Sequence, residues 1–317
     1  MISFIASRAA FAGFLLLTLS SFVFILFFVA PGDPARMIAG ERATEAQLVQ
    51  LRSNLGLDRP IPEQYVKFLG RAIQGDLGFS YRNQQPVIML IANRMPATLS
   101  LVLGAMVLWL MIGIPIGIVS AISPGGIKDR LGQSFILIGL SFPTFVLGMM
   151  ALYFLYFLPR QAGFTLFPPG GYKPFLADPW LWAWHLALPW MTLALVTAAV
   201  YARLTRGQML EVMGEDYIRT ARAKGLPEWK VTLRHGLRST LTPLLTQLGA
   251  DVATLLGGAI VIEQVFGLQG VGALAVQAVQ SQDRPIIIGV VLLAGAFIVV
   301  TNIIVDALYV LLDPRIR

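Results

Sequence analysis

The chain has 317 residues, of which 56% are hydrophobic and only 13% are charged, and its formal net charge is +7. Soluble domains place charge on about a quarter of their residues, so this composition excludes an ordinary soluble domain and indicates one membrane bundle. Cysteine is absent and the only histidines are His185 and His235, which excludes disulfides, thiolate catalysis and a cysteine or histidine metal site.

Six long apolar runs predict six membrane-spanning helices, because about 20 apolar residues cross roughly 30 Å of hydrocarbon. The runs lie between Arg8 and Asp33, Arg94 and Lys128, Arg130 and Arg160, Asp178 and Arg203, Arg238 and Glu263, and Arg284 and Asp313. A cleaved signal peptide is the alternative for the first run, but its apolar core exceeds about 15 residues and no A-x-A site closes it. We therefore expect residues 1–30 to be a retained N-terminal transmembrane helix.

The basic residues lie in the loops between these runs, which is the pattern of membrane topology. A basic platform with interleaved aromatic residues is missing, so the expected partner is the lipid bilayer and no nucleic acid. Short loops on one side carry many basic residues and those on the other side carry only Arg160, Lys173 and Arg284. This bias predicts cytoplasmic N- and C-termini, with Arg8, Arg315 and Arg317 inside. Residues 31–96 are long enough to translocate regardless of their charge.

The segment 31–96 is predicted to be extracytoplasmic and helical. Thr44 and Gln47 form a capping-box pattern, and Gly56 is a stop signal for that first short helix. A second short helix is expected from Pro62 to near Gly75, followed by the turn-rich stretch GDLGFSYRNQQPV. A small cap on the outer mouth of the bundle is the expected result.

The only long, charged cytoplasmic loop is predicted at 203–238, and it contains the stretch EDYIRTARAKGL. Its apolar residues recur at three-to-four spacing, with Glu215 and Arg219 expected to pair one turn apart. Gly225 is a helix stop and Pro227 suits the first turn of another helix, which predicts a helix, a glycine break and a helix. Such a unit either lies on anionic headgroups or docks with a soluble partner.

Two acids fall inside predicted spans, where a charge is costly and indicates a pathway or an internal pairing. Asp251, in a span rich in small residues, is predicted to line a translocation path, and Asn302 and Asp306 are predicted to lock helices together. In the alternative of a stand-alone secondary transporter or channel, Asp251 and Asp306 would couple ions, but the two halves show no convincing repeat. No residues assemble into a catalytic triad or metal cluster, so an enzyme is disfavoured.

Several blocks in a fixed order resemble the transmembrane subunits of bacterial ABC importers, within the dipeptide/oligopeptide permease group. They are APGDP at 30–34, GDLGFS at 75–80, SFPTF at 141–145, RLTRGQMLEVMGEDYIRTARAKGL at 203–226, VIEQVFGLQGVG at 261–272 and NIIVDALYVLLDPRIR at 302–317. The resemblance covers nearly the whole chain. It implies an all-α, six-span, MetI-like permease fold whose five-helix core occupies 97–317.

The resemblance also implies a role for the charged loop. Residues 219–225 are similar to the "EAA" loop of that family, although only Ala221 and Gly225 match its general pattern and Arg219 replaces the glutamate. In the family this loop docks on an ATPase subunit and transmits its closure to the membrane helices. The implied coupling residues are Glu215, Asp216, Arg219, Thr220, Ala221, Arg222, Lys224 and Gly225.

The implied partners are a second, similar permease, two ATP-binding subunits that hold ATP and Mg, and an extracytoplasmic solute-binding protein. The chain itself has no GxxxxGK[ST] loop, so we expect it to be a non-catalytic subunit without a cofactor in the bacterial inner membrane. Peptide is the expected cargo, but the group also includes permeases for nickel chelates, glutathione and some saccharides.

Overall fold

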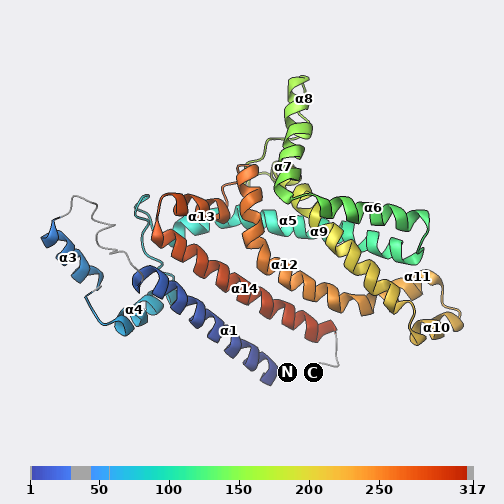
Figure 1. The fold of residues 1–317 in the computed structure, drawn as a ribbon, viewed down its shortest axis with the longest axis horizontal. Coiled ribbons are helices and arrows are strands. Elements are labelled where there is room, and N and C mark those ends of the chain that lie inside the picture. The colour runs from blue at the N-terminus through green and yellow to red at the C-terminus, as the bar shows by residue number, and fades with distance from the viewer. Residues whose placement is uncertain (1, 30–43, 57, 313–317) are drawn as a thin grey trace. The chain divides into compact units, whose positions relative to one another are not determined.

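The computed structural model describes residues 2–29, 44–56 and 58–312, and every regular element in these ranges is a helix (Figure 1). In chain order the elements are α1 (Ile2–Phe24), η1 (Ile25–Val29), α3 (Glu45–Leu55), α4 (Ile61–Ile73), α5 (Val87–Ile122), α6 (Ile127–Ser141), α7 (Thr144–Leu152), η2 (Tyr153–Phe157), α8 (Leu158–Gln161), α9 (Pro179–Val212), α10 (Asp216–Ala223), α11 (Glu228–Lys230), η3 (Val231–Gly236), α12 (Leu237–Val265), α13 (Val271–Gln280) and α14 (Arg284–Leu312). The APGDP block at 30–34 and the terminal Arg315 and Arg317 lie outside the described residues.

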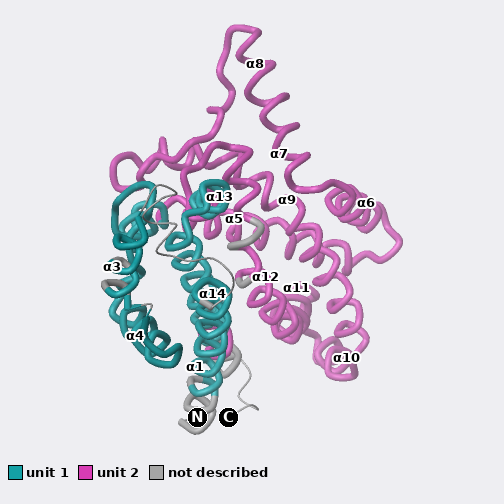
Figure 2. The backbone as a smooth tube through the Cα atoms, turned by 60° about the vertical axis from the view of Figure 1, so that its left-hand side comes forward, with its two compact units in different colours: residues 1–95, 274–303 teal, residues 96–273, 304–317 magenta. Residues whose placement is uncertain are grey.

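The backbone forms two compact units (Figure 2). Unit 1 comprises residues 1–95 and 274–303, and unit 2 comprises residues 96–273 and 304–317. The predicted domains 1–30, 31–96 and 97–317 are divided by membrane topology, whereas these units are divided by compactness. The predicted division therefore stays a prediction.

Most of the predicted spans are confirmed as long apolar helices. Four helices are long and apolar enough to cross a membrane, namely Ala10–Phe28, Val87–Ile122, Pro179–Val212 and Arg284–Ala307. The bent pair α6 and α7–α8 makes a fifth if it counts as one span. The predicted fifth run lies within α12, a helix of 29 residues, whose membrane crossing stays a prediction. The chain is thus an all-helical, multi-pass membrane protein.

The third predicted span is not one straight helix. The chain bends by 95° between Ile127–Ser141 and Thr144–Gln161, so that α7 and α8 point away from α6 (Figure 1). The break falls at Phe142 and Pro143, where Phe142 is extended with φ −110° and ψ 133°. Proline disfavours the helical conformation of the residue before it and removes a backbone donor, which explains the break.

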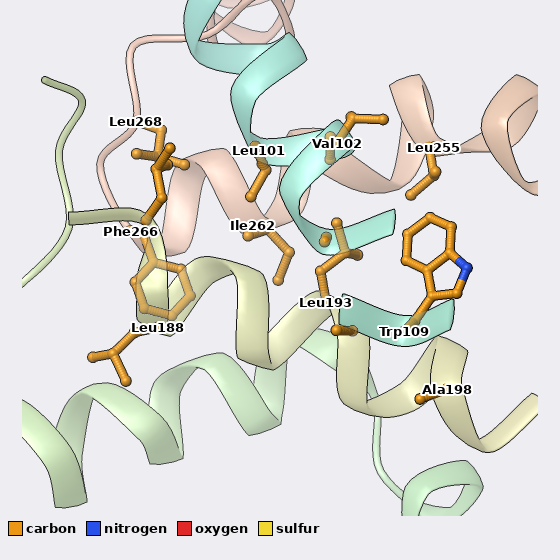
Figure 3. Packing of buried hydrophobic residues seen from close by; sticks show 14 of the residues in the cluster. Leu101, Val102, Trp109, Leu188, Leu193, Ala198, Leu255, Ile262, Phe266 and Leu268 are labelled. Carbon is orange, nitrogen blue, oxygen red and sulfur yellow. The ribbon is translucent and has the colours of Figure 1, made fainter. Parts of the chain in front are cut away.

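The core of unit 2 is built by α5, α9, α12 and the turn after α12 (Figure 3). Trp109 and Leu101 from α5 pack with Leu193 from α9 and Ile262 from α12, and all four are almost completely buried. Each of these helices is apolar around much of its circumference, which permits burial in a bundle on one side and lipid contact on another. The core therefore joins the helices that flank the charged loop.

Glycines bring α5 and α9 into close contact. A Cβ atom on Gly113 would lie 2.6 Å from the Ala198 carbonyl oxygen, and one on Gly117 would lie 2.5 Å from the Thr205 Cβ. Neither position has room for a side chain. Close helix packing thus accounts for these glycines, as is usual for small residues in membrane helices.

The short helices predicted for residues 31–96 are confirmed in unit 1. Thr44 and Gln47 form the reciprocal capping box of α3, and Gly56 ends that helix with a φ of +69°. The next helix, α4, begins at Ile61 with Pro62 in its first turn and lies beside α1. Tyr65 holds the two helices together, because its hydroxyl lies 2.9 Å from the hydroxyls of both Ser20 and Ser21.

A buried aspartate anchors the turn-rich stretch after α4. Asp283, 2% exposed, accepts hydrogen bonds from the Ser80 hydroxyl at 2.5 Å and from the backbone N–H groups of Tyr81 and Arg82, both at 3.3 Å. These contacts join the stretch to the residue that precedes α14. A buried carboxylate is stable here because neighbouring donors replace water.

A second buried carboxylate organises the end of α12 in unit 2. Glu263 is fully buried, and it accepts hydrogen bonds from the Thr98 hydroxyl at 2.5 Å and the Ala273 N–H at 2.7 Å. A Cβ atom on Gly270 would lie 2.1 Å from a Glu263 carboxylate oxygen. Gly270, in the VIEQVFGLQGVG block, therefore makes room for the carboxylate that holds the turn.

Candidate functional site

The charged loop forms a compact elbow, which we define as residues 213–236, between α9 and α12. Helix α9 continues to Val212, so residues 203–212 of the predicted loop are an extension of that helix. The short helix α10 follows and ends before Gly225, whose φ of +73° is left-handed and whose N–H donates to the Arg222 carbonyl at 2.9 Å. Pro227 then precedes α11. The predicted order of helix, glycine break and helix is confirmed.

The elbow has a small apolar interior. Ile218, Ala221 and Val231 are buried together, and Val212, Met213 and Leu226 pack against them. Burial of one face of α10 explains how so short a helix is held, since an isolated helix of eight residues is unstable in water. Of the implied coupling residues, Ala221 therefore faces the interior of the elbow.

The other implied coupling residues lie on the exposed face of the elbow: Glu215, Asp216, Arg219, Thr220, Arg222, Lys224 and Gly225. The Arg219 guanidinium pairs with Asp216 at 3.3 Å, which corrects the expected pairing of Arg219 with Glu215. Arg222 donates two hydrogen bonds to Glu228, at 2.8 and 3.4 Å. Helix α10 begins only at Asp216. Glu215 is its N-cap residue and has an extended backbone, so it is not one helical turn before Arg219. Exposed pairs of this kind are weak and can exchange partners.

Sequence reasoning missed an aromatic and aliphatic surface on the second half of the elbow. Trp229 is 63% exposed with the Lys230 ammonium 5.4 Å from its ring centroid, and Leu233 is 49% exposed. Tyr217 is also exposed, and its hydroxyl donates to Ser239 at 2.9 Å. The tryptophan after Pro227 was the available signal, because an exposed large aromatic residue marks a contact surface.

A partly buried ion pair, also missed, lies where α9 leads toward the elbow. Arg206 donates from Nε and Nη2 to the two carboxylate oxygens of Asp129, at 2.7 and 2.8 Å. The Gly125 N–H also donates to Asp129 at 2.9 Å, and the aspartate side chain is only 6% exposed. The pair thus joins the turn between α5 and α6 to α9. A parallel bidentate pair fixes orientation as well as distance.

Asp251 lies in α12 beside a group of unsatisfied polar atoms. Its Oδ1 accepts a hydrogen bond from Gln247 at 2.9 Å, while its Oδ2 is buried without a hydrogen-bond partner among the described residues. The same holds for the Tyr201 hydroxyl and the Trp109 Nε1, whose ring centroids are 6.1 Å apart. The Tyr201 hydroxyl lies close enough to interact with both Asp251 and Trp109, so a polar ligand or water can bridge the three groups.

The remaining predicted residues are on α14. Asn302 is exposed and Asp306 is half-buried, and their role in locking helices stays a prediction. In the described part of the chain, no three His, Asp or Glu side chains gather to hold a metal ion.

Comparison with known proteins identifies the family. Residues 113–317 match the model of the binding-protein-dependent transport system inner membrane component, and residues 1–102 match the model of its N-terminal part. The chain is 42% identical over 302 residues to a glutathione transport system permease protein of Pectobacterium atrosepticum, covering 95% of this chain and 94% of the relative. It is 40% identical over 317 residues to a putative peptide transport system permease protein of Brucella abortus, covering 100% of this chain and 99% of the relative.

The chain is also 39% identical over 296 residues to a probable peptide ABC transporter permease protein of Sinorhizobium fredii. That match covers 93% of each chain. These matches confirm the resemblance drawn from the sequence blocks. The chain belongs to the family of binding-protein-dependent transport system inner membrane components, the multi-pass permease subunits of ABC importers.

Proposed function

We propose that the chain forms half of the translocation pathway of an ATP-driven peptide importer, and that its elbow receives the closing movement of a separate ATPase subunit. The elbow geometry is the observation that carries the proposal. A short helix packs by a buried apolar face against η3 and the end of α9, and presents its charged face outward. This arrangement suits a lever better than a helix lying on lipid, because α10 buries its apolar face within the elbow and its outward face carries mainly charged residues.

The elbow can move two membrane helices together. It is continuous with α9 on one side and with α12 on the other, and these helices pack against each other in the core of unit 2. Through Arg206 and Asp129 the movement would also reach the turn between α5 and α6. Alternating access requires two packings of such helices, and a partner that binds one packing better shifts the balance between them.

The ATPase chemistry belongs to other subunits in this proposal. The sequence has no phosphate-binding GxxxxGK[ST] loop, so ATP and Mg would be bound by two partner subunits. A second permease completes the pathway, and an extracytoplasmic solute-binding protein delivers the cargo. The elbow and both termini lie in the cytoplasm under the predicted topology.

Peptide cargo is supported by the relatives, whose names specify peptides or glutathione. Asp251 is our candidate for the pathway, because an intramembrane carboxylate with an unpaired oxygen can bind the ammonium end of a peptide. A stand-alone transporter coupled to ions through Asp251 and Asp306 has no observation in its favour.

The test is to purify the chain from its native membrane in mild detergent, identify its partners and assay ATPase activity. We expect a second permease and two ATPase subunits, with hydrolysis stimulated by a peptide-loaded binding protein. Recovery of the chain alone, together with uptake driven only by a proton gradient, would reject the importer and support ion coupling.

A further inference from the structure

Unit 1 contains a cavity of about 770 Å³ that has no part in the proposed coupling. It lies among η1, α4, the stretch 76–84 and the start of α14. Two candidate spans, Ala10–Phe28 and Arg284–Ala307, meet it at their ends, through Phe24 and Phe28 from the first and Pro285 and Ile288 from the second. A cavity at the ends of spanning helices lies at the level where lipid headgroups meet acyl chains.

One wall of the cavity is aromatic. Phe24, Phe28 and Phe68 pack in a triangle, with ring centroids 5.1 to 5.7 Å apart. These rings join α4 to the end of the first span, and α4 lies beside α1 in unit 1 (Figure 1). The wall therefore offers an apolar surface to one end of a ligand.

Basic side chains form a second part of the lining, the basic wall. Arg59, Lys67 and Arg71 line the cavity, and Asp76 is the single acid among the described lining residues. A Cβ atom on Gly56 would lie 3.9 Å from both the Arg59 Nε and the Lys67 Nζ, so these two cations face the same point. Glu63 pairs with Arg59, and Asp76 accepts the Gly78 N–H at 3.0 Å, whereas Lys67 and Arg71 have no acidic partner among the described residues. An anion between the basic side chains would relieve their repulsion.

We propose that this cavity binds an anionic phospholipid, with the phosphate on Lys67 and Arg71 and an acyl chain along the phenylalanine wall. The combination of excess positive charge and an aromatic wall at the ends of two spans favours an amphiphile over a soluble anion. Basic pockets beside spanning helices bind lipid headgroups by the same forces. The lipid would brace α4, and with it the external segment, against the first span.

The test compares the double variant Lys67→Gln/Arg71→Gln with the wild-type chain in the purified complex. Phosphatidylglycerol is titrated into phosphatidylcholine nanodiscs, and bound lipid is measured by native mass spectrometry. Each Lys or Arg near an anionic surface contributes about 1 kcal/mol to binding, so two together correspond to about 30-fold in affinity. We expect the double variant to bind phosphatidylglycerol more weakly by about that factor. The control Arg160→Gln/Lys173→Gln removes the same charge from loops predicted on the same side, and its affinity should not change.

Equal affinity in the two double variants would overturn the proposal, because the basic wall would then be an ordinary solvated surface. Glycerol phosphate and a free peptide are added as competitors at matched concentration. Failure of both to displace the lipid supports an amphiphile site. Displacement by glycerol phosphate would assign the site to soluble phosphates instead, and displacement by the peptide would assign it to cargo. Lipid retention is measured without transport, so the result is independent of the proposed function.

Discussion

The guanidinium of Arg206 donates two hydrogen bonds, of 2.7 and 2.8 Å, to the carboxylate of Asp129, which lies 77 residues earlier in the sequence. The aspartate lies just before the third predicted span and the arginine just after the fourth, so one ion pair connects the start of α6 to α9, the helix that leads into the elbow. A buried carboxylate that loses its cation is left with an uncompensated charge. In the proposed function, the pair would transmit movement of the elbow to the turn between α5 and α6.

Arg206→Gln should lower the melting temperature of the purified complex by several degrees and reduce ATP-driven uptake, since Asp129 loses its two charged hydrogen bonds. The double variant Asp129→Asn/Arg206→Gln should lose less than the two single variants together, because the uncompensated charge is gone. Strictly additive losses in thermal unfolding would show that the two side chains do not act as a pair.

Gly225→Pro should uncouple ATP hydrolysis from uptake while the chain still inserts into the membrane. Proline cannot adopt a φ of +73° and removes the N–H that donates to Arg222. Gly75→Pro is the matched control, because Gly75 has a φ of +80° and donates to Ala72 in the same way, but lies outside the elbow in the segment predicted to be external. Normal uptake by the Gly225 variant would remove the elbow from the mechanism.

Arg219→Ala/Arg222→Ala should leave stability within about 0.5 kcal/mol, because both ion pairs are exposed. The same variant should release the ATPase subunits at lower salt than the wild-type complex, since charged contacts to a partner are screened by salt. Co-purification across a salt series measures this effect. Lys128→Ala/Arg130→Ala removes the same charge outside the elbow and should retain the subunits, and equal release by both variants would contradict a specific role.

Asp251→Asn should reduce uptake of peptides with a free N-terminus at least tenfold, roughly the effect of losing one charged hydrogen bond. Stability should be unchanged or slightly higher, because a buried oxygen without a partner is replaced by a neutral amide. Uptake of an N-acetylated peptide should change little. Asp58→Asn, a substitution of an exposed residue in the segment predicted to be external, serves as the control. An equal loss for both peptides would assign Asp251 to structure.

Gly270→Ala should destabilise the complex by about 1–3 kcal/mol, as expected for overpacking, because its Cβ would collide with the Glu263 carboxylate. Gly13→Ala adds the same methyl group where nothing lies within 4 Å, and should have little effect. Thermal unfolding in detergent compares the two. A mild effect at Gly270 would mean that the turn after α12 can shift away from Glu263.

Features of the protein that depend on neighbouring residues were predictable from the sequence. The apolar runs require burial or lipid wherever they occur, which identifies an all-helical membrane protein. The capping box of Thr44 and Gln47, the helix stop at Gly56 and the break at Gly225 each arise within one or two turns of backbone. The bend at Pro143 has an equally local cause, but a count of apolar residues between charges does not register it.

Only the tertiary structure decided which distant groups meet. How the helices pack decides that Asp129 pairs with Arg206 and that Thr98 donates to Glu263. It also decides that Ala221 is buried inside the elbow, and no local pattern specifies these contacts. The same is true of the cavity in unit 1, where the basic residues of α4 meet Phe24 and Phe28 of the first span and Pro285 and Ile288 of α14. Packing energy is summed over many weak contacts between segments far apart in sequence, so these partners emerge only once the helices are assembled.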